Sequence, residues 1–112
     1  MSPEPTAGDT KTAAAYNQSG RELLNQRKFG EALAELNAAL RLKPDFPQAL
    51  NARGFTYYMQ KDYVNALKDL DEAIRLKSDY QNAYQNRSLV RKAAGDAKGS
   101  AEDQARAKEL TH

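Results

Sequence analysis

Apolar residues recur along most of the chain at the spacing of amphipathic helices. In the segment 64–76 they follow an i, i+3/i+4, i+7 pattern, which places them on one face of a helix. The segment 30–42 carries the same stripe, with charged residues between the apolar positions. The apolar residues of the later segment are Val64, Ala66, Leu67, Leu70, Ala73, Ile74 and Leu76. The pattern predicts helices at about 11–26, 30–42, 47–60, 64–76, 81–93 and 97–110.

The residues themselves also return at a fixed interval. The hexapeptide RLKPDF at 41–46 reappears as RLKSDY at 75–80. Further residues match at the same offset: Gly20 with Gly54, Ala32 with Ala66, Leu36 with Leu70, Ala39 with Ala73, and Arg53 with Arg87. So many matches at one offset indicate an internal repeat made of two helices. A single helix pair cannot bury its apolar face alone, so the units are expected to stack.

Turn and capping residues mark the ends of several predicted helices. Pro44 breaks the helix before it, and Pro47 suits a first helical turn, where no backbone N–H is needed. Asp45 followed by Gln48 resembles a capping box. Asp96, in the turn between the last two helices, is predicted to cap the final one.

These signals divide the chain into a leader and one domain. Residues 1–10 (MSPEPTAGDT) are rich in Pro, Gly, Ser and Thr, so we predict a disordered leader whose Asp9 or Thr10 caps the first helix. Residues 11–112 are predicted to form a single domain of three units, at about 13–46, 47–80 and 81–112.

The period and the repeated residues resemble those of the tetratricopeptide repeat family. That family has small residues where two helices approach closely and larger ones between them. The first unit matches with Tyr16, Gly20, Leu23, Ala32, Leu36, Ala39 and Pro44, and the second with Leu50, Gly54, Tyr57, Ala66, Leu70 and Ala73. The third unit retains Tyr84 and Ala107 but departs from the pattern at Ser88, Arg91, Ser100 and Gln104. These polar departures favour a last unit whose outer face meets water.

The resemblance implies an all-α fold. It would be an α-solenoid, a right-handed superhelix of three antiparallel helix-turn-helix pairs with six helices. It also implies a protein–protein interaction scaffold in which the first helix of each pair lines a concave groove for a peptide or protein segment. The residues that the family's groove positions select here are Asn17, Arg21, Gln48, Asn51, Phe55, Tyr58, Asn82, Gln85, Asn86 and Leu89.

The character of this residue set suits a peptide. Side-chain amides both donate and accept hydrogen bonds, as a peptide backbone requires. Phe55, Tyr58, Met59 and Leu89 could form an apolar strip that anchors a side chain. In the alternative interpretation, the amides only solvate the groove and the apolar strip is partly buried by stacking.

Other functions remain as alternatives. A subclass of the family clamps the terminal carboxylate of chaperones with Lys, Asn and Arg, but a two-point clamp is not favoured, because only one of the five equivalent positions is basic. Those positions hold Asn17, Arg21, Ala52, Asn82 and Asn86. The chain could instead be a self-assembling structural module, or a natural or engineered fragment of a larger repeat protein. An enzyme is the weakest alternative.

The composition of the chain limits the classes of partner that we expect it to bind. With 17 Lys and Arg against 15 Asp and Glu, the net charge of +2 gives no strong attraction to nucleic acid or to an anionic membrane. No apolar run approaches the roughly 18 residues of a membrane span, so membrane insertion is not expected. We expect a protein or peptide partner and a monomer or weak homo-oligomer. A cytoplasmic location is the default, because the first dozen residues lack an apolar signal-peptide core, although a removed signal sequence stays open.

Catalytic, cofactor and metal sites are not predicted. The chain has no cysteine, and its single histidine is the terminal residue, His112. The segment 95–100 (GDAKGS) has the wrong residue order for a phosphate loop and is predicted to be a plain turn. Asp69, Asp71 and Glu72 form a local acidic cluster that we interpret as a solvated helix face.

Overall fold

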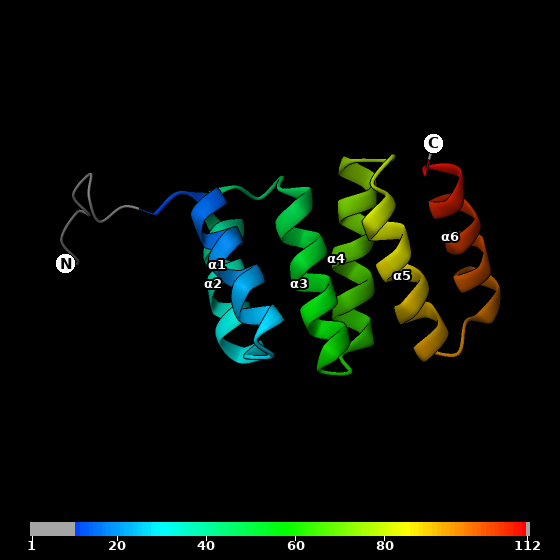
Figure 1. Cartoon of the computed structure of the whole chain (residues 1–112), viewed down its shortest axis with the longest axis horizontal. Coiled ribbons are helices and arrows are strands. Elements are labelled where there is room, and N and C mark those ends of the chain that lie inside the picture. The colour runs from blue at the N-terminus through cyan, green and yellow to red at the C-terminus, as the bar shows by residue number, and fades with distance from the viewer. Residues whose placement is uncertain (1–10, 112) are drawn as a thin grey trace.

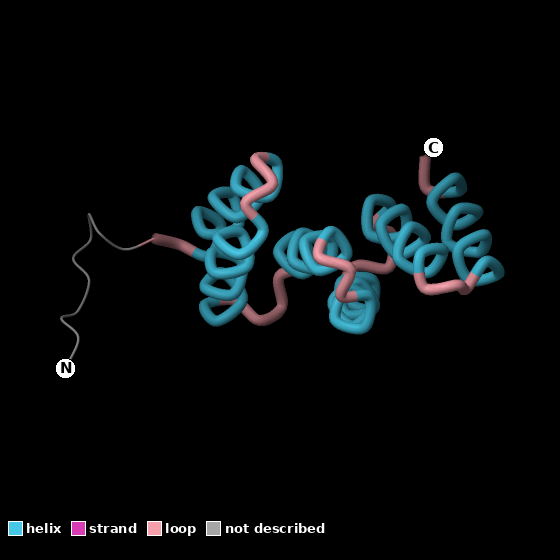
Figure 2. Tube along the Cα trace, turned by 90° about the horizontal axis from the view of Figure 1, so that it is seen from below, coloured by secondary structure: helices cyan, strands magenta, loops and turns pink. Residues whose placement is uncertain are grey.

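The computed structural model describes residues 11–111, and within them it contains six α-helices in three antiparallel pairs (Figure 1). The pairs are α1 (Ala13–Asn25) with α2 (Phe29–Leu42), α3 (Pro47–Met59) with α4 (Tyr63–Leu76), and α5 (Gln81–Ala93) with α6 (Ala97–Glu109). Figure 2 shows the pairs following one another along the molecule, each joined to the next by a short loop. The predicted all-α stack of six helices is confirmed, and the helix bounds agree closely with those predicted. The predicted leader lies outside the described residues.

Short polar side chains cap three of the helices. The Oγ1 of Thr12 accepts a free N–H in the first turn of α1, and Asp62 and Asp96 do the same for α4 and α6. Asp96 is the cap that the sequence predicts. The prediction of Asp9 or Thr10 as the cap of α1 is wrong, because the helix begins later and Thr12 is the residue beside its first turn.

The capping box predicted before α3 is also wrong. Phe46, not Asp45, stands at the N-cap, and no side chain bonds to the first turn there. Pro47 occupies the start of the helix as predicted and has no N–H that needs a partner. The Phe46 side chain has no hydrogen-bonding atom to offer the first turn and is buried in the apolar core.

Each pair closes through a turn residue in the left-handed region. Arg27, Lys61 and Gly95 occupy the same place in the three units and have φ angles of 63°, 64° and 92°. Only glycine adopts this conformation without cost, so the two basic residues are held there by the bonded turns around them. Gly95 and Asp96 therefore form an ordinary helix–helix turn, as predicted, but residues 97–100 of the predicted turn are the first turn of α6.

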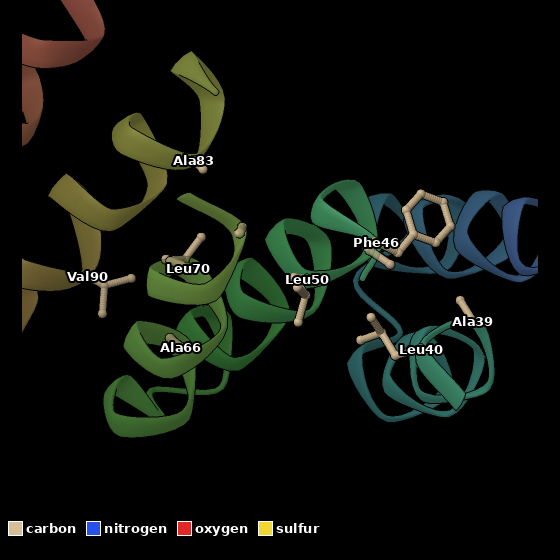
Figure 3. Packing of buried hydrophobic residues seen from close by; sticks show 10 residues of the cluster. Ala39, Leu40, Phe46, Leu50, Ala66, Leu70, Ala83 and Val90 are labelled. Carbon is tan, nitrogen blue, oxygen red and sulfur yellow. The ribbon is translucent and has the colours of Figure 1, made fainter. Parts of the chain in front are cut away.

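Small residues allow the two helices of a pair to pack closely. Ala32, Ala39, Ala66 and Ala73 are completely buried beside the larger Leu36 and Leu70. A Cβ atom added at Gly20 would lie 2.6 Å from Cγ of Leu36, so only glycine fits at that crossing. Figure 3 shows the core continuing across the junctions between pairs, with Leu70 of α4 near Ala83 and Val90 of α5.

At each of the two junctions between helix pairs, one arginine joins a pair to the pair before it through several hydrogen bonds of its guanidinium. Arg53 of α3 donates to both carboxylate oxygens of Asp69 on α4, each at 2.8 Å, and to Asn37 of α2 at 3.0 Å. Its hydrogen bonds to Asp69 raise the pKa of the Arg53 guanidinium, against the burial that lowers it. The prediction that Asp69 lies on a solvated face is wrong, because Arg53 binds this carboxylate and the residue is buried.

The second junction repeats the same arrangement one unit later. Arg87 of α5 donates to both oxygens of Asp103 on α6, at 2.8 and 3.0 Å, and to Asp71 of α4 at 3.0 Å. Arg91 adds a further bond to Asp103 at 3.0 Å. Burial lowers the pKa of the Arg87 guanidinium, but the bonds and charges of Asp103 and Asp71 outweigh it and raise that pKa. The matched spacing of Arg and Asp was the signal that could have revealed both contacts.

Gly20→Ala is expected to lower the free energy of unfolding by about 1–3 kcal/mol, because the new methyl group overlaps Leu36. Gly30→Ala is the matched control, since nothing lies within 4 Å of an added Cβ there and alanine favours helix. Urea denaturation measures both. Equal losses in the two variants would contradict the close-packing argument.

Asp69→Ala is expected to lower the free energy of unfolding by about 3 kcal/mol, because it leaves the partly buried Arg53 guanidinium without its carboxylate partner. Asp71→Ala removes a carboxylate whose side chain is mostly exposed, so its cost should stay below about 1 kcal/mol. Urea midpoints of the two variants give the comparison. A loss for Asp71→Ala as large as that for Asp69→Ala would show that burial of the pair is not what matters.

Candidate functional site

The first helices of the three pairs form a continuous surface with a hollow in it. Helix α1 contacts α3, and α3 contacts α5. The hollow has a volume of about 410 Å³ and is open to solvent. Its lining residues are Arg21, Leu24 and Asn25 of α1, Gln48, Asn51, Ala52 and Phe55 of α3, Tyr80 before α5, and Asn82 and Asn86 of α5.

The hollow gathers six of the predicted groove residues and adds four from outside that set, Leu24, Asn25, Ala52 and Tyr80. The predicted residues that line it are Arg21, Gln48, Asn51, Phe55, Asn82 and Asn86. Tyr80 packs against the core between two units, and its hydroxyl also accepts from Asn51 at the hollow. Because Tyr80 lies in a loop, outside the periodic helix positions, the repeat pattern carries no signal for this role.

Four predicted groove residues lie elsewhere. Tyr58 packs on the core, with its ring 5.7 Å from that of Phe55 and 6.1 Å from that of Tyr63. Gln85 and Leu89 line a second hollow of about 500 Å³ between α5 and α6, on the last pair. The apolar strip expected from Phe55 to Leu89 is therefore divided between two places. Asn17, the fourth, is buried.

The amides at the α3–α5 junction are bonded to one another. Asn51 Nδ2 donates to Asn82 Oδ1 at 3.1 Å and to the Tyr80 hydroxyl at 3.3 Å, and its Oδ1 accepts from Asn86 Nδ2 at 3.0 Å. Asn86 also donates to Asn82 at 3.0 Å. Asn51 is only 7% exposed, and its hydrogen bonds hold α3 to α5, so its amide is not free to bind a ligand.

The equivalent amide at the α1–α3 junction is unpaired. Asn17 is the counterpart of Asn51 in the preceding unit and is also 7% exposed, but its Oδ1 has no hydrogen-bond partner among the described residues. The residue equivalent to the donor Asn86 is Ala52, which offers no side-chain hydrogen bond. A buried acceptor without a partner typically costs about 1–3 kcal/mol, so the contrast between these junctions calls for a physical explanation.

The lining of the hollow carries formal charge of only one sign among the described residues. Of the described residues that line it, Arg21 is the only one with a formal charge, and it is exposed. Arg21 forms no ion pair within residues 11–111. A ligand's carboxylate would therefore meet a cation here that no acid of the described chain already neutralises.

The described residues do not form a cluster of side chains suited to metal binding. Within residues 11–111, no group of three or more His, Asp or Glu side chains is placed to hold a metal ion. Asp69 and Asp71 of the acidic cluster bind Arg53 and Arg87, and Glu72 pairs with Arg75. None of the helices in the described part has the length and apolar character needed to cross a membrane.

Comparison with solved structures finds the same architecture in several proteins. The first TPR domain of Spaghetti (RPAP3), solved bound to the HSP90 peptide SRMEEVD, is 25% identical, with a TM-score of 0.86 over 92% of this chain and 82% of that one. The first TPR domain of human RPAP3, solved by NMR, has the same identity of 25% and TM-score of 0.86, over 89% of this chain and 79% of that one. MamA is 22% identical, with a TM-score of 0.82 over 91% of this chain and 60% of that one, and shows the fold alone.

Sequence comparisons complete this result. A search of curated proteins found no match. The family model for the tetratricopeptide repeat matches residues 17–81, which is more than half of the chain and includes both helices of the second unit. With the regular repeat and the three stacked helix pairs, this match shows that the chain belongs to the tetratricopeptide repeat family.

Proposed function

We propose that the chain is a non-enzymatic protein-interaction domain that binds an extended peptide segment in the hollow between α1, α3 and α5. The observation that carries this proposal is the lining of the hollow. It combines exposed amides, one unpaired cation and apolar side chains in a concave surface of peptide-binding size. The peptide bound to the similar first domain of Spaghetti (RPAP3) supports the same class of ligand.

Each kind of lining residue has a distinct task. The exposed amide of Gln48 can donate to and accept from the main chain of the segment. Asn82 can donate through its Nδ2, because its Oδ1 already accepts from Asn51 and Asn86. Phe55, Leu24 and Tyr80 supply an apolar contact for one of its side chains. Arg21 favours a segment with an acidic group, because its charge is unopposed at the hollow.

The carboxylate-clamp alternative has less support. Two fixed cations are needed to grip a terminal carboxylate at two points, and Arg21 is the one charged residue among the described residues that line the hollow. An acidic side chain within a segment needs only one such contact. The ligand is therefore expected to be recognised along its length and not by a free terminus.

Arg21→Glu tests the proposal. Peptides are first selected on the wild-type protein from a display library of random linear peptides, and their affinities are then measured by calorimetry. Reversal of the charge should weaken the acidic peptides by about tenfold or more at low salt, with a smaller effect at high salt. Arg41→Glu is the matched control, since Arg41 is also an exposed arginine but lies on α2, outside this hollow.

Two results would contradict the proposal. One is a selection that enriches no peptide. The other is a set of enriched peptides that bind Arg21→Glu and Phe55→Ala as tightly as the wild type. Phe55→Ala removes the central apolar contact and should weaken binding by about 1–2 kcal/mol. Val64→Ala, a change on the exposed outer face of α4, should leave the affinity unchanged.

A further inference from the structure

A further hollow lies at the junction between α2 and α3, and we call it the α2–α3 hollow. It has a volume of about 430 Å³ and is open to solvent. It shares no lining residue with the hollow between α1, α3 and α5, so it is a separate place on the molecule. Its lining combines two arginines, one amide and three apolar side chains: Asn37, Leu40, Arg41, Pro44, Leu50 and Arg53.

The two arginines of the α2–α3 hollow are only partly neutralised. Arg41 is exposed and forms no ion pair within residues 11–111. Arg53 binds one carboxylate, that of Asp69, and its third hydrogen bond goes to the neutral Asn37. Two guanidinium charges therefore stand against one carboxylate, which leaves an excess of positive charge at this junction.

The equivalent arginines one unit later are each matched by acid. Arg87 binds a second carboxylate, that of Asp71, in the place where the α2–α3 hollow has the neutral Asn37. The exposed arginine of that junction, Arg75, pairs with Glu72 of the same helix. The excess charge of the α2–α3 hollow is therefore a property of this one junction and not of the repeat.

The polar groups that remain free in the α2–α3 hollow are donors. Three of the five guanidinium N–H groups of Arg53 bond to Asp69 and Asn37, so two remain. The Oδ1 of Asn37 already accepts from Arg53, which leaves its Nδ2 to donate. Arg41 adds N–H groups and no acceptor. A ligand that fits here must bring negative charge and several acceptor oxygens.

We propose that the α2–α3 hollow binds the phosphate group of a small organic phosphate monoester. Such a group carries a charge of about −1.5 to −2 near neutral pH and three acceptor oxygens, which suits two guanidiniums and an amide on two helices. A carboxylate has one charge and two oxygens, so it would leave donors unused. The volume of the hollow is in the range of small-molecule sites.

The apolar part of the lining can hold the organic group of the ester. Pro44 is exposed, and Leu40 and Leu50 line the hollow beside it. Figure 3 shows the two leucines on the helices that meet here, Leu40 on α2 and Leu50 on α3. A flat apolar group attached to the phosphate would contact these side chains while the phosphate meets the arginines.

NMR titration of isotope-labelled protein with phenyl phosphate tests the inference. We expect shifts that saturate below about 10 mM and are concentrated at residues 37–53. Inorganic phosphate, which lacks the ring, and benzoate, which lacks the phosphate, should each bind more weakly. Arg41→Gln should weaken phenyl phosphate by about tenfold, because it removes a charge-assisted contact. Arg21→Gln, in the hollow between α1, α3 and α5, is the matched control and should leave this affinity unchanged.

Asn37→Asp provides the second variant, since it copies the residue that the next junction carries. The new carboxylate still accepts from Arg53, as Asp71 accepts from Arg87, so the thermal midpoint should not fall. It also places negative charge in the lining, so phenyl phosphate should bind at least tenfold more weakly. Gln104→Glu makes the same change in net charge at an exposed position of α6 and should leave the affinity unchanged.

Several results would overturn the inference. Phenyl phosphate that produces no saturable shift excludes the site, and binding that persists unchanged in Arg41→Gln and Asn37→Asp places the ligand elsewhere. Benzoate that binds as tightly as phenyl phosphate contradicts the assignment of a phosphate group, and inorganic phosphate that does so contradicts the apolar contact. The outcomes are independent of the peptide proposal, which depends on Arg21 and Phe55 in the other hollow.

Discussion

The forked hydrogen bonds of Arg53 and Arg87 fix how one helix pair sits against the next, and the groove depends on them. Each guanidinium joins its own pair to the second helix of the pair before it. A helix pair has too little internal core to stay folded alone, so its position on its neighbour determines both its stability and its shape. If these bonds loosened, α1, α3 and α5 would no longer hold a fixed concave surface.

The outer face of the third helix pair lacks the residues that hold the earlier pairs together. The acceptors for the forked arginines are Asn37 and Asp71, and the next equivalent position holds Ala105, which cannot accept. Gln104 and Lys108 likewise stand where Leu70 and Ile74 pack in the second unit. This face of α6 therefore offers neither the polar nor the apolar contacts that join the first three pairs.

The fold could be predicted because its information is periodic and local. A stripe of small and large apolar residues specifies both the helices and their close packing, and the fixed offset between units specifies the stacking. The wrong predictions concern places where a local rule competes with tertiary structure. Asp45 fits a capping box, but burial of Phe46 decides the helix start, and Asp69 fits a solvated face until Arg53 is placed beside it. The site was harder to predict. The family's groove positions include Arg21 and Gln48, which line the hollow, but they do not tell which amides are already bonded to neighbours one unit away.

Two junctions with the same fold therefore offer a ligand different chemistry. The α3–α5 junction is closed by its own amides, while the α1–α3 junction presents an unopposed cation among the described residues and no such amide network. NMR chemical-shift mapping of isotope-labelled protein with one selected peptide distinguishes the two junctions. We predict the largest shifts at Arg21, Ala52 and Phe55. Shifts concentrated at Leu89 and the α6 face, with Arg21 and Ala52 unmoved, would contradict the assignment of the ligand to the α1–α3 junction.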